Sequence, residues 1–283
     1  MGCVTVIGAI LGIILGIWFI SFLESLSLVQ WLVILILFVL GAIVFYAMLK
    51  SPSETSDFNT DSKPVSAGDY NILVKNGQVT IARFISVDSG TIKIPSMINN
   101  MPVRVIGTGA FKDCKQMEKV MIPGSVIEIQ DNAFQNCSGL REGVMSSTVK
   151  KLGKAVFCDC RNISRINLPD GITIIPEKCF YYCQELHALN LPASVKWIDR
   201  QAFAESGLRN VSLPEGIQKI GSEAFGHCGS LRAILIPKEL KDIADDAFRS
   251  TWSITIYCFG NSYGLEYARK HNINYADAEK WPQ

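Results

Sequence analysis

A repeat of about 23 residues constrains this chain more than any other feature of its sequence. Phenylalanine recurs seven times, with five of the six intervals 23 residues long and one 22. Five residues before each phenylalanine lies an isoleucine or a leucine, and the residue immediately before it is usually alanine. We expect each repeat to be one coil of a solenoid in which like residues stack in ladders. The recurring residues are Phe111, Phe134, Phe157, Phe180, Phe203, Phe225 and Phe248.

Each repeat also contains a predicted short strand that ends at a proline. In LNLP at 189–192 and VMIP at 120–123, aliphatic residues alternate with variable ones, as in a strand with one buried side. Proline has no N–H to give to a ladder and therefore closes the strand. The third repeat departs from this pattern, since Gly143 replaces an aliphatic residue and Ser146 replaces the proline. We expect that coil to be bulged or locally soft.

These repeats resemble those of BspA-like leucine-rich repeat proteins. VIGTGAFKDCKQMEKVMIPGSV at 105–126 and IGSEAFGHCGSLRAILIPKEL at 220–240 carry the pattern, roughly I-G-x-x-A-F-x-x-C-x-x-L-x-x-I-x-I-P. The resemblance covers residues 69–275, with a looser first coil and a last strand followed by a short helix. It implies a solenoid of about eight coils with a parallel sheet on its concave side. It also implies a family associated with bacterial surfaces and with binding of protein or matrix partners.

The variable strand positions form a candidate binding surface. A parallel sheet facing water is a broad and rigid platform, and solenoids commonly bind partners there. A merely solvated surface is the plainer interpretation of the same residues. The candidate residues are Lys93, Lys119, Met121, Glu142, Val144, Arg165, Asn167, Asn190, Asn210, Ser212 and Leu235.

Two apolar runs predict a membrane anchor in residues 1–50. The runs cover 4–23 and 28–49, and the only charged residues in this segment are Glu24 and Lys50. Each run has about the 20 residues that a helix needs to cross a bilayer, so we expect a hairpin of two transmembrane helices. A secretory signal peptide is the alternative for the first run, but a basic n-region and a cleavage-site pattern are both missing.

The first run has a face of small residues, and a polar linker follows the second run. Gly8, Gly12 and Gly16 recur every four residues. This spacing favours close packing within the hairpin, with helix-mediated self-association as the alternative. Residues 51–68 are rich in Ser, Thr, Asp and Pro, and we expect a flexible tether there. Residues 276–283 are expected to be a tail after the repeat domain.

Signals for the side of the membrane disagree. Both ends of a hairpin share one side, and Lys50 and Lys63 on that side favour a cytoplasmic repeat domain. Many unpaired cysteines agree with a reducing compartment. The family resemblance points instead to the cell surface, and the lysines tip the prediction for this expected integral membrane protein slightly toward a cytoplasmic repeat domain.

The cysteines have a structural interpretation. Five of the nine lie three residues after a repeat phenylalanine, a slot that holds Ser206 and Thr251 in other repeats. A slot shared by Cys, Ser and Thr needs a small side chain, which favours buried free thiols over disulfides or a zinc site. Cys158 occupies a variable position and is expected to be exposed. The recurring cysteines are Cys114, Cys137, Cys160, Cys183 and Cys228.

The chain as a whole favours binding over catalysis. Its net charge of +1 is the sum of 0 over residues 1–50, −2 over 51–68 and +3 over the rest, so no segment is basic enough to suggest nucleic acid. No catalytic, phosphate-binding or metal-binding motif occurs, and we predict no enzyme activity, cofactor or metal. We expect a membrane-anchored module that binds a protein or a glycan through its sheet. A scaffold that clusters membrane partners through its transmembrane helices is the alternative.

Overall fold

The computed structural model describes residues 64–86 and 90–282. The chain divides into two units, Met1–Thr60 and Asp61–Gln283, and every described residue belongs to the second. The predicted transmembrane helices at 4–23 and 28–49 therefore lie outside the described residues. Within 64–86 and 90–282, no helix is long and apolar enough to cross a bilayer.

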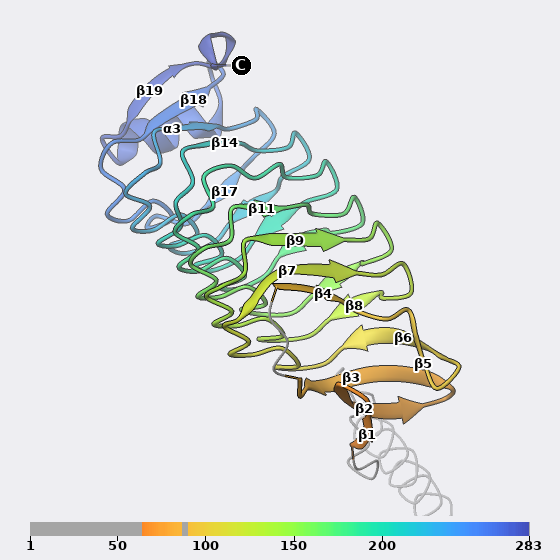
Figure 1. Ribbon diagram of the computed structural model, residues 1–283. Coiled ribbons are helices and arrows are strands. Elements are labelled where there is room, and N and C mark those ends of the chain that lie inside the picture. Colours follow the sequence, from red (N-terminus) through yellow and green to blue (C-terminus); the bar gives the residue numbers. More distant parts are fainter. Residues whose placement is uncertain (1–63, 87–89, 283) are drawn as a thin grey trace, which may run out of the picture. The chain divides into compact units, whose positions relative to one another are not determined.

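The second unit is a parallel β-solenoid of about nine turns, which confirms the predicted solenoid (Figure 1). The coils contribute strands to two sides, except that the coil of Phe180 has no strand on the first side, and neighbouring strands within a side pair in parallel wherever they pair. The first side, here called the strand face, contains β4 (Gly90–Lys93), β7 (Met117–Ile122), β9 (Glu142–Met145), β11 (Arg165–Ile166), β14 (Asn210–Ser212), β16 (Ala233–Leu235) and β18 (Thr255–Cys258). The second side contains β3 (Gln78–Phe84), β6 (Met101–Ile106), β8 (Glu128–Ile129), β10 (Lys151–Leu152), β12 (Ile174–Ile175), β13 (Trp197–Ile198), β15 (Lys219–Ile220) and β17 (Asp242–Ile243).

Both ends of the solenoid are covered by elements outside the repeat. At the start, β1 (Val65–Ala67) and β2 (Tyr70–Lys75) continue antiparallel from β3, so ordered structure begins inside the segment assigned to the linker. At the other end, α3 (Tyr263–Lys270) leads into β19 (Asn274–Asp277), which pairs in parallel with β18. A short 3-10 helix, η1 (Ala278–Lys280), follows, so residues assigned to the tail extend the last sheet and lie against it.

A stack of phenylalanine rings runs through the whole solenoid on the side where the coils turn, here called the turn side. From Phe111 to Phe248, successive ring centroids are 5.1–5.6 Å apart with interplanar angles of at most 15°. Such offset stacking stabilises aromatic pairs beyond the area they bury. Tyr70 packs against the first rings of the stack, and Tyr267 packs edge-on against the last.

Phe84 is an eighth member of this stack that the repeat pattern does not include. Its ring lies 5.2 Å from that of Phe111, although the two are 27 residues apart in sequence rather than 23. The extra residues form a hairpin between β5 (Met97–Ile98) and β6. Asn99 and Asn100 form its turn with φ of 50° and 60°, values that asparagine tolerates better than most residues.

The turn side is also held by a continuous backbone ladder. In the coil of Phe111, the N–H groups of Gly109, Phe111 and Asp113 donate to carbonyl oxygens of the next coil at 3.0, 2.7 and 2.9 Å. From Phe111 to Phe225, the residues two before and two after each repeat phenylalanine have positive φ, as in Asn132 and Asn136 at 57° and 58°. This alternation turns every second N–H toward the next coil, so each coil is bonded to the following one.

The ladder of the second side is interrupted at Pro176. The residue after each of these strands normally donates its N–H to the preceding coil, as Gly153 does to Ile129 and Asp199 to Ile175. Proline has no N–H and cannot make this bond. Accordingly, β10 and β12 are not paired, and the side is divided into two sheets.

Gly143 does not produce the predicted bulge, and the alternative of a locally soft coil stays a prediction. Strand β9 pairs with β7 in unbroken register from Glu142 to Met145. The Ile166 side chain of the next coil lies 3.2 Å from the position that a Cβ of Gly143 would occupy, and so fills part of the space left by the glycine. The irregular register lies instead between Gly90 and Thr91.

Candidate binding face

The candidate residues predicted from the strand pattern lie on the outer side of the strand face. In β7, Val120 and Ile122 are buried while Met121 is 37% exposed, because successive side chains of a strand point to opposite sides. Lys119, Glu142, Val144 and Leu235 are half-buried, and the remaining seven candidates are exposed. Ala233, which the same alternation places outward, is buried.

A row of charged side chains crosses the first coils of the face. The Lys119 ammonium lies 2.9 Å from Glu142, and the Arg165 guanidinium lies 3.6 Å from the same carboxylate. The hydrogen bond from Lys119 holds the pKa of Glu142 below its usual value, and the charges of Lys119 and Arg165 act in the same direction. The Arg165 side chain is 78% exposed, so its charge is open to solvent.

Asn167 has a structural role on this face. Its side-chain oxygen accepts from the Met145 N–H at 2.9 Å, and its side-chain nitrogen donates to the Met145 carbonyl at 2.8 Å. The amide thus makes the pair of bonds that a neighbouring strand residue would make. It ties its own coil to the preceding one and is committed to the fold.

The sheet of the strand face is interrupted beside Asn167. Strand β11 pairs with β9 and β14 pairs with β16, but residues 188–190 between them form no strand. In the part of the chain that the structure describes, no hydrogen bond engages the backbone of residues 188–191. Their N–H and C=O groups are therefore left without protein partners in the middle of a sheet.

Two adjoining hollows lie over this interruption, and together they are called the groove here. The first has a volume of about 470 Å³ and is lined by Glu142, Arg165 and Asn167. The second, of about 410 Å³, is lined by Asn210 and Ser212. Residues 188–190, which include the candidate Asn190, line both. The groove also takes in Val144, whereas Lys93, Lys119, Met121 and Leu235 lie outside it.

Two features of this face were missed by reasoning from the sequence. Trp281, in the predicted tail, lines the second hollow and packs edge-on against Tyr257 with ring centroids 5.3 Å apart. A large aromatic side chain in an otherwise polar tail is the sequence signal that could have indicated packing against the repeat domain. The second feature is a set of three exposed arginines that share one repeat position at the start of the strands, with Ser164 and His187 at that position in the coils between the first and the second. The set contains Arg141, Arg209 and Arg232.

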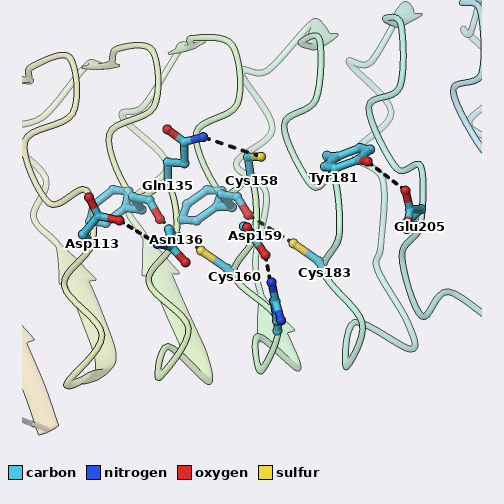
Figure 2. Close-up of polar contacts among 12 residues, drawn as sticks. Asp113, Gln135, Asn136, Cys158, Asp159, Cys160, Tyr181, Cys183 and Glu205 are labelled. Carbon is cyan, nitrogen blue, oxygen red and sulfur yellow. Dashed lines mark hydrogen bonds and ion pairs between the residues drawn. The ribbon is translucent and has the colours of Figure 1, made fainter.

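The eight described cysteines are free thiols, as the ladder interpretation predicts. The structure adds a reason for the slot, which is a hydrogen bond to the preceding coil (Figure 2). The thiols of Cys137 and Cys160 donate to the carbonyls of Phe111 and Phe134 at 3.0 and 3.1 Å. The Thr251 hydroxyl makes the equivalent bond to Phe225 at 2.8 Å. In these coils the slot holds a small donor, whereas the Ser206 hydroxyl contacts the Cys228 sulfur at 3.6 Å.

Cys158 is not exposed as predicted. It is buried, and its sulfur lies 4.0 Å from the side-chain nitrogen of Gln135 on the neighbouring coil (Figure 2). Burial raises the pKa of this thiol above its usual value, which opposes formation of a reactive thiolate. Among residues 64–86 and 90–282, no group of three His, Cys, Asp or Glu side chains is placed to hold a metal ion.

Comparison with known proteins identifies the repeat. The family model of the BspA type leucine rich repeat region matches residues 89–206 and 150–267, in six copies. No curated protein matches the chain. Among solved structures, a leucine rich cell surface protein from Faecalibacterium prausnitzii A2-165 is 23% identical, with a TM-score of 0.49, 70% of this chain covered and 71% of the other. A leucine-rich repeat protein from Bacteroides ovatus is 25% identical, with a TM-score of 0.49 and coverage of 69% and 52%.

Proposed function

The chain belongs to the family of BspA-type leucine-rich repeat proteins, and from this membership we propose that it is a membrane-anchored, non-catalytic binding module. Its partner, a protein or a glycan, binds along the strand face. The observation that carries the proposal is the groove over residues 188–190, where backbone polar groups without protein partners lie beside exposed side chains. Buried or half-covered polar groups of this kind gain free energy when a ligand satisfies them.

The rest of the solenoid supports this use of the strand face. The phenylalanine stack and the turn-side ladder hold successive coils in register without any contribution from the groove. A rigid scaffold with a locally open surface reduces the entropy lost on binding, because few groups must be ordered. Binding residues in many proteins are presented by such rigid frameworks.

A charge-reversal experiment tests the binding face. Arg165→Glu combined with Arg209→Glu changes two exposed cations beside the groove and leaves the Lys119–Glu142 pair intact. We expect the full-length protein in detergent to lose capture of the partner that the wild type retains from extracts of its own cells. The free energy of unfolding should fall by no more than about 1 kcal/mol, because Arg165→Glu places a second carboxylate opposite Glu142 while Arg209 is exposed.

The matched control reverses two cations away from the strand face. Lys112 and Arg200 are exposed and belong to the turn side, and no ion pair of either is found within the described residues. Lys112→Glu with Arg200→Glu should leave capture unchanged. If this control weakens capture and the Arg165 and Arg209 pair does not, the binding face is wrong. Loss of capture only on removal of residues 1–60 would favour the membrane scaffold instead.

The membrane anchor is tested separately. The two apolar runs at 4–23 and 28–49 predict that carbonate extraction leaves the full-length protein in the membrane pellet. A chain truncated to residues 61–283 should be released. Protease added to intact cells should cleave the repeat domain only if that domain faces outward. The result decides between a cytoplasmic domain, which the lysines favour, and a cell-surface domain, which the family favours. A full-length chain that washes off the membrane contradicts the anchor.

A further inference from the structure

The groove over residues 188–190 has the features of a site for an acidic oligosaccharide. We propose that it binds a sugar chain bearing carboxylate or sulfate groups, an inference that rests on the proposed use of the strand face. Three observations point to this ligand: the charge of the surrounding face, the mixture of donors and acceptors on the groove floor, and the aromatic ring at one end.

The charge of the face indicates an anionic ligand. Two consecutive residues open the strand-face segment of each coil. Over the six pairs 118–119, 141–142, 164–165, 187–188, 209–210 and 232–233, five side chains are basic and two are acidic, with histidine counted as neutral. Glu142 is neutralised by Lys119, whereas Arg141 and Arg209 are exposed and have no ion pair within the described residues. Such an excess of one sign attracts ligands of the opposite sign and excludes like-charged ones. The basic residues are Lys119, Arg141, Arg165, Arg209 and Arg232.

The groove floor favours a sugar over an acidic peptide side chain. Residues 188–191 present both N–H donors and C=O acceptors that lack protein partners. Asn190, Asn210 and Ser212 add amide and hydroxyl groups, and all three are exposed. A carboxylate can only accept hydrogen bonds, whereas each sugar hydroxyl donates and accepts. A hydroxyl-rich ligand can therefore satisfy both kinds of group at once.

Trp281 supplies the third feature. Its half-buried ring lines the second hollow, and Tyr257 holds it edge-on. The apolar face of a pyranose ring can pack against such an indole, which has a large surface and loses little conformational freedom. The hollows, at about 470 and 410 Å³, are within the range of small-ligand sites, so one short chain can span both.

The direct test is binding of defined probes to the full-length protein in detergent micelles. We expect isothermal titration to detect a heparin-derived octasaccharide and an oligogalacturonate, and to detect no cello-oligosaccharide of equal length. Binding should weaken as salt is raised, because exposed charges are screened. Poly-glutamate of matched charge serves as the peptide probe and should bind at least about tenfold more weakly than the acidic sugars.

Asn190→Asp probes the floor with little change of shape. Asn190 is exposed and no hydrogen bond of its side chain is found in the described part of the chain, so folding should be unaffected. The new carboxylate repels an acidic ligand, and we expect about tenfold weaker binding of both acidic probes. The control, Thr173→Asp, adds the same charge at an exposed residue next to β12 and should leave binding unchanged.

The outcomes separate this inference from the broader proposal. Equal binding of poly-glutamate, or equal effects of Asn190→Asp and Thr173→Asp, overturns the sugar site. Absence of binding by both acidic sugars does so as well. If partner capture still depends on Arg165 and Arg209 in those cases, the strand face remains the binding face for another ligand. If capture is independent of these arginines, the proposed function fails too.

Discussion

The turn side and the strand face of the solenoid are built from the same coils but differ in continuity. On the turn side, stacked rings run from Phe84 to Phe248 with no gap, and the backbone ladder follows them. On the strand face, the sheet stops after β11 and begins again at β14. The second side is also divided, at Pro176. Both interruptions lie in or next to the coil of Phe180.

This difference shows which interactions keep the coils in register. The ring centroid of Phe180 lies 5.6 and 5.5 Å from those of Phe157 and Phe203, even though the coil of Phe180 has no strand pairing on the strand face. In a solenoid, each repeat is stabilised by its contacts with its two neighbours. The turn side supplies those contacts, and the strand face is thereby free to carry polar groups without protein partners.

The largest expected effect is the loss of a ring from the turn-side stack. Phe134 is fully buried and lies between Phe111 and Phe157, so truncation leaves a cavity that the neighbouring rings cannot fill. We expect Phe134→Ala to lower the free energy of unfolding by about 3–5 kcal/mol, measured by chemical denaturation. Met121→Ala on the strand face, where the side chain is partly exposed, should cost less than about 1 kcal/mol. Similar costs at both sites would remove the distinction between the two sides.

The next effect concerns the thiol slot of the turn side. Cys137→Ala removes one of two donors to the Phe111 carbonyl, which keeps the Cys114 N–H at 3.2 Å, and should cost about 1 kcal/mol, the typical net value of one hydrogen bond. Cys137→Ser keeps a donor, as Thr251 does in its own coil, and should cost less than about 1 kcal/mol. Thermal unfolding of the two variants gives the comparison. An alanine that is as well tolerated as the serine would show that the slot selects only for size.

The sequence predicts the turn side better than the strand face for a physical reason. The turn side repeats the same contacts in every coil, so the spacing of Phe111, Phe134 and their successors appears directly as a period. The thiol slot was predicted to be buried on the same grounds. The prediction that Cys158 is exposed was wrong, because its repeat position holds different residue types and this variability was taken as a sign of exposure. Phe84 was missed because the β5 hairpin changes the spacing.

The groove could not be predicted because it arises where the repeat fails. Alternation along the strands gives the outward direction of Asn190 and Asn210, but it contains no information on whether neighbouring strands pair. Residues 188–190 follow the same alternation as the strands of the other coils, so nothing in the repeat pattern marks them as unpaired. Trp281 reaches the second hollow from beyond the repeat, so no period could place it.

A smaller effect is expected from restoring the ladder at Pro176. Pro176→Ala returns an N–H that can donate to the Leu152 carbonyl, as Gly153 does to Ile129. The gain of about 1 kcal/mol for the bond is largely offset by the greater freedom of the unfolded chain without proline. We expect little change in stability but slow hydrogen exchange of the new amide. Fast exchange would show that the second side is interrupted by more than the missing N–H.

A last small effect tests the cost of the turn-side backbone itself. His227 has φ of 56°, and its side chain is exposed. Its N–H donates to Arg249 in the next coil, so the strained conformation is held by the ladder. Asparagine adopts positive φ more readily than histidine, and His227→Asn should raise the free energy of unfolding by about 0.5 kcal/mol.

The strand face supplies the control for this substitution. Arg209 is equally exposed but has no positive φ, so Arg209→Asn should give no such gain. Both variants remove a large side chain, and their difference isolates the backbone term, measured as the shift in denaturation midpoint. A gain at Arg209 equal to that at His227 would assign the effect to surface composition. A loss at His227 would mean that its imidazole makes a stabilising contact, and that strain is not what distinguishes the turn side.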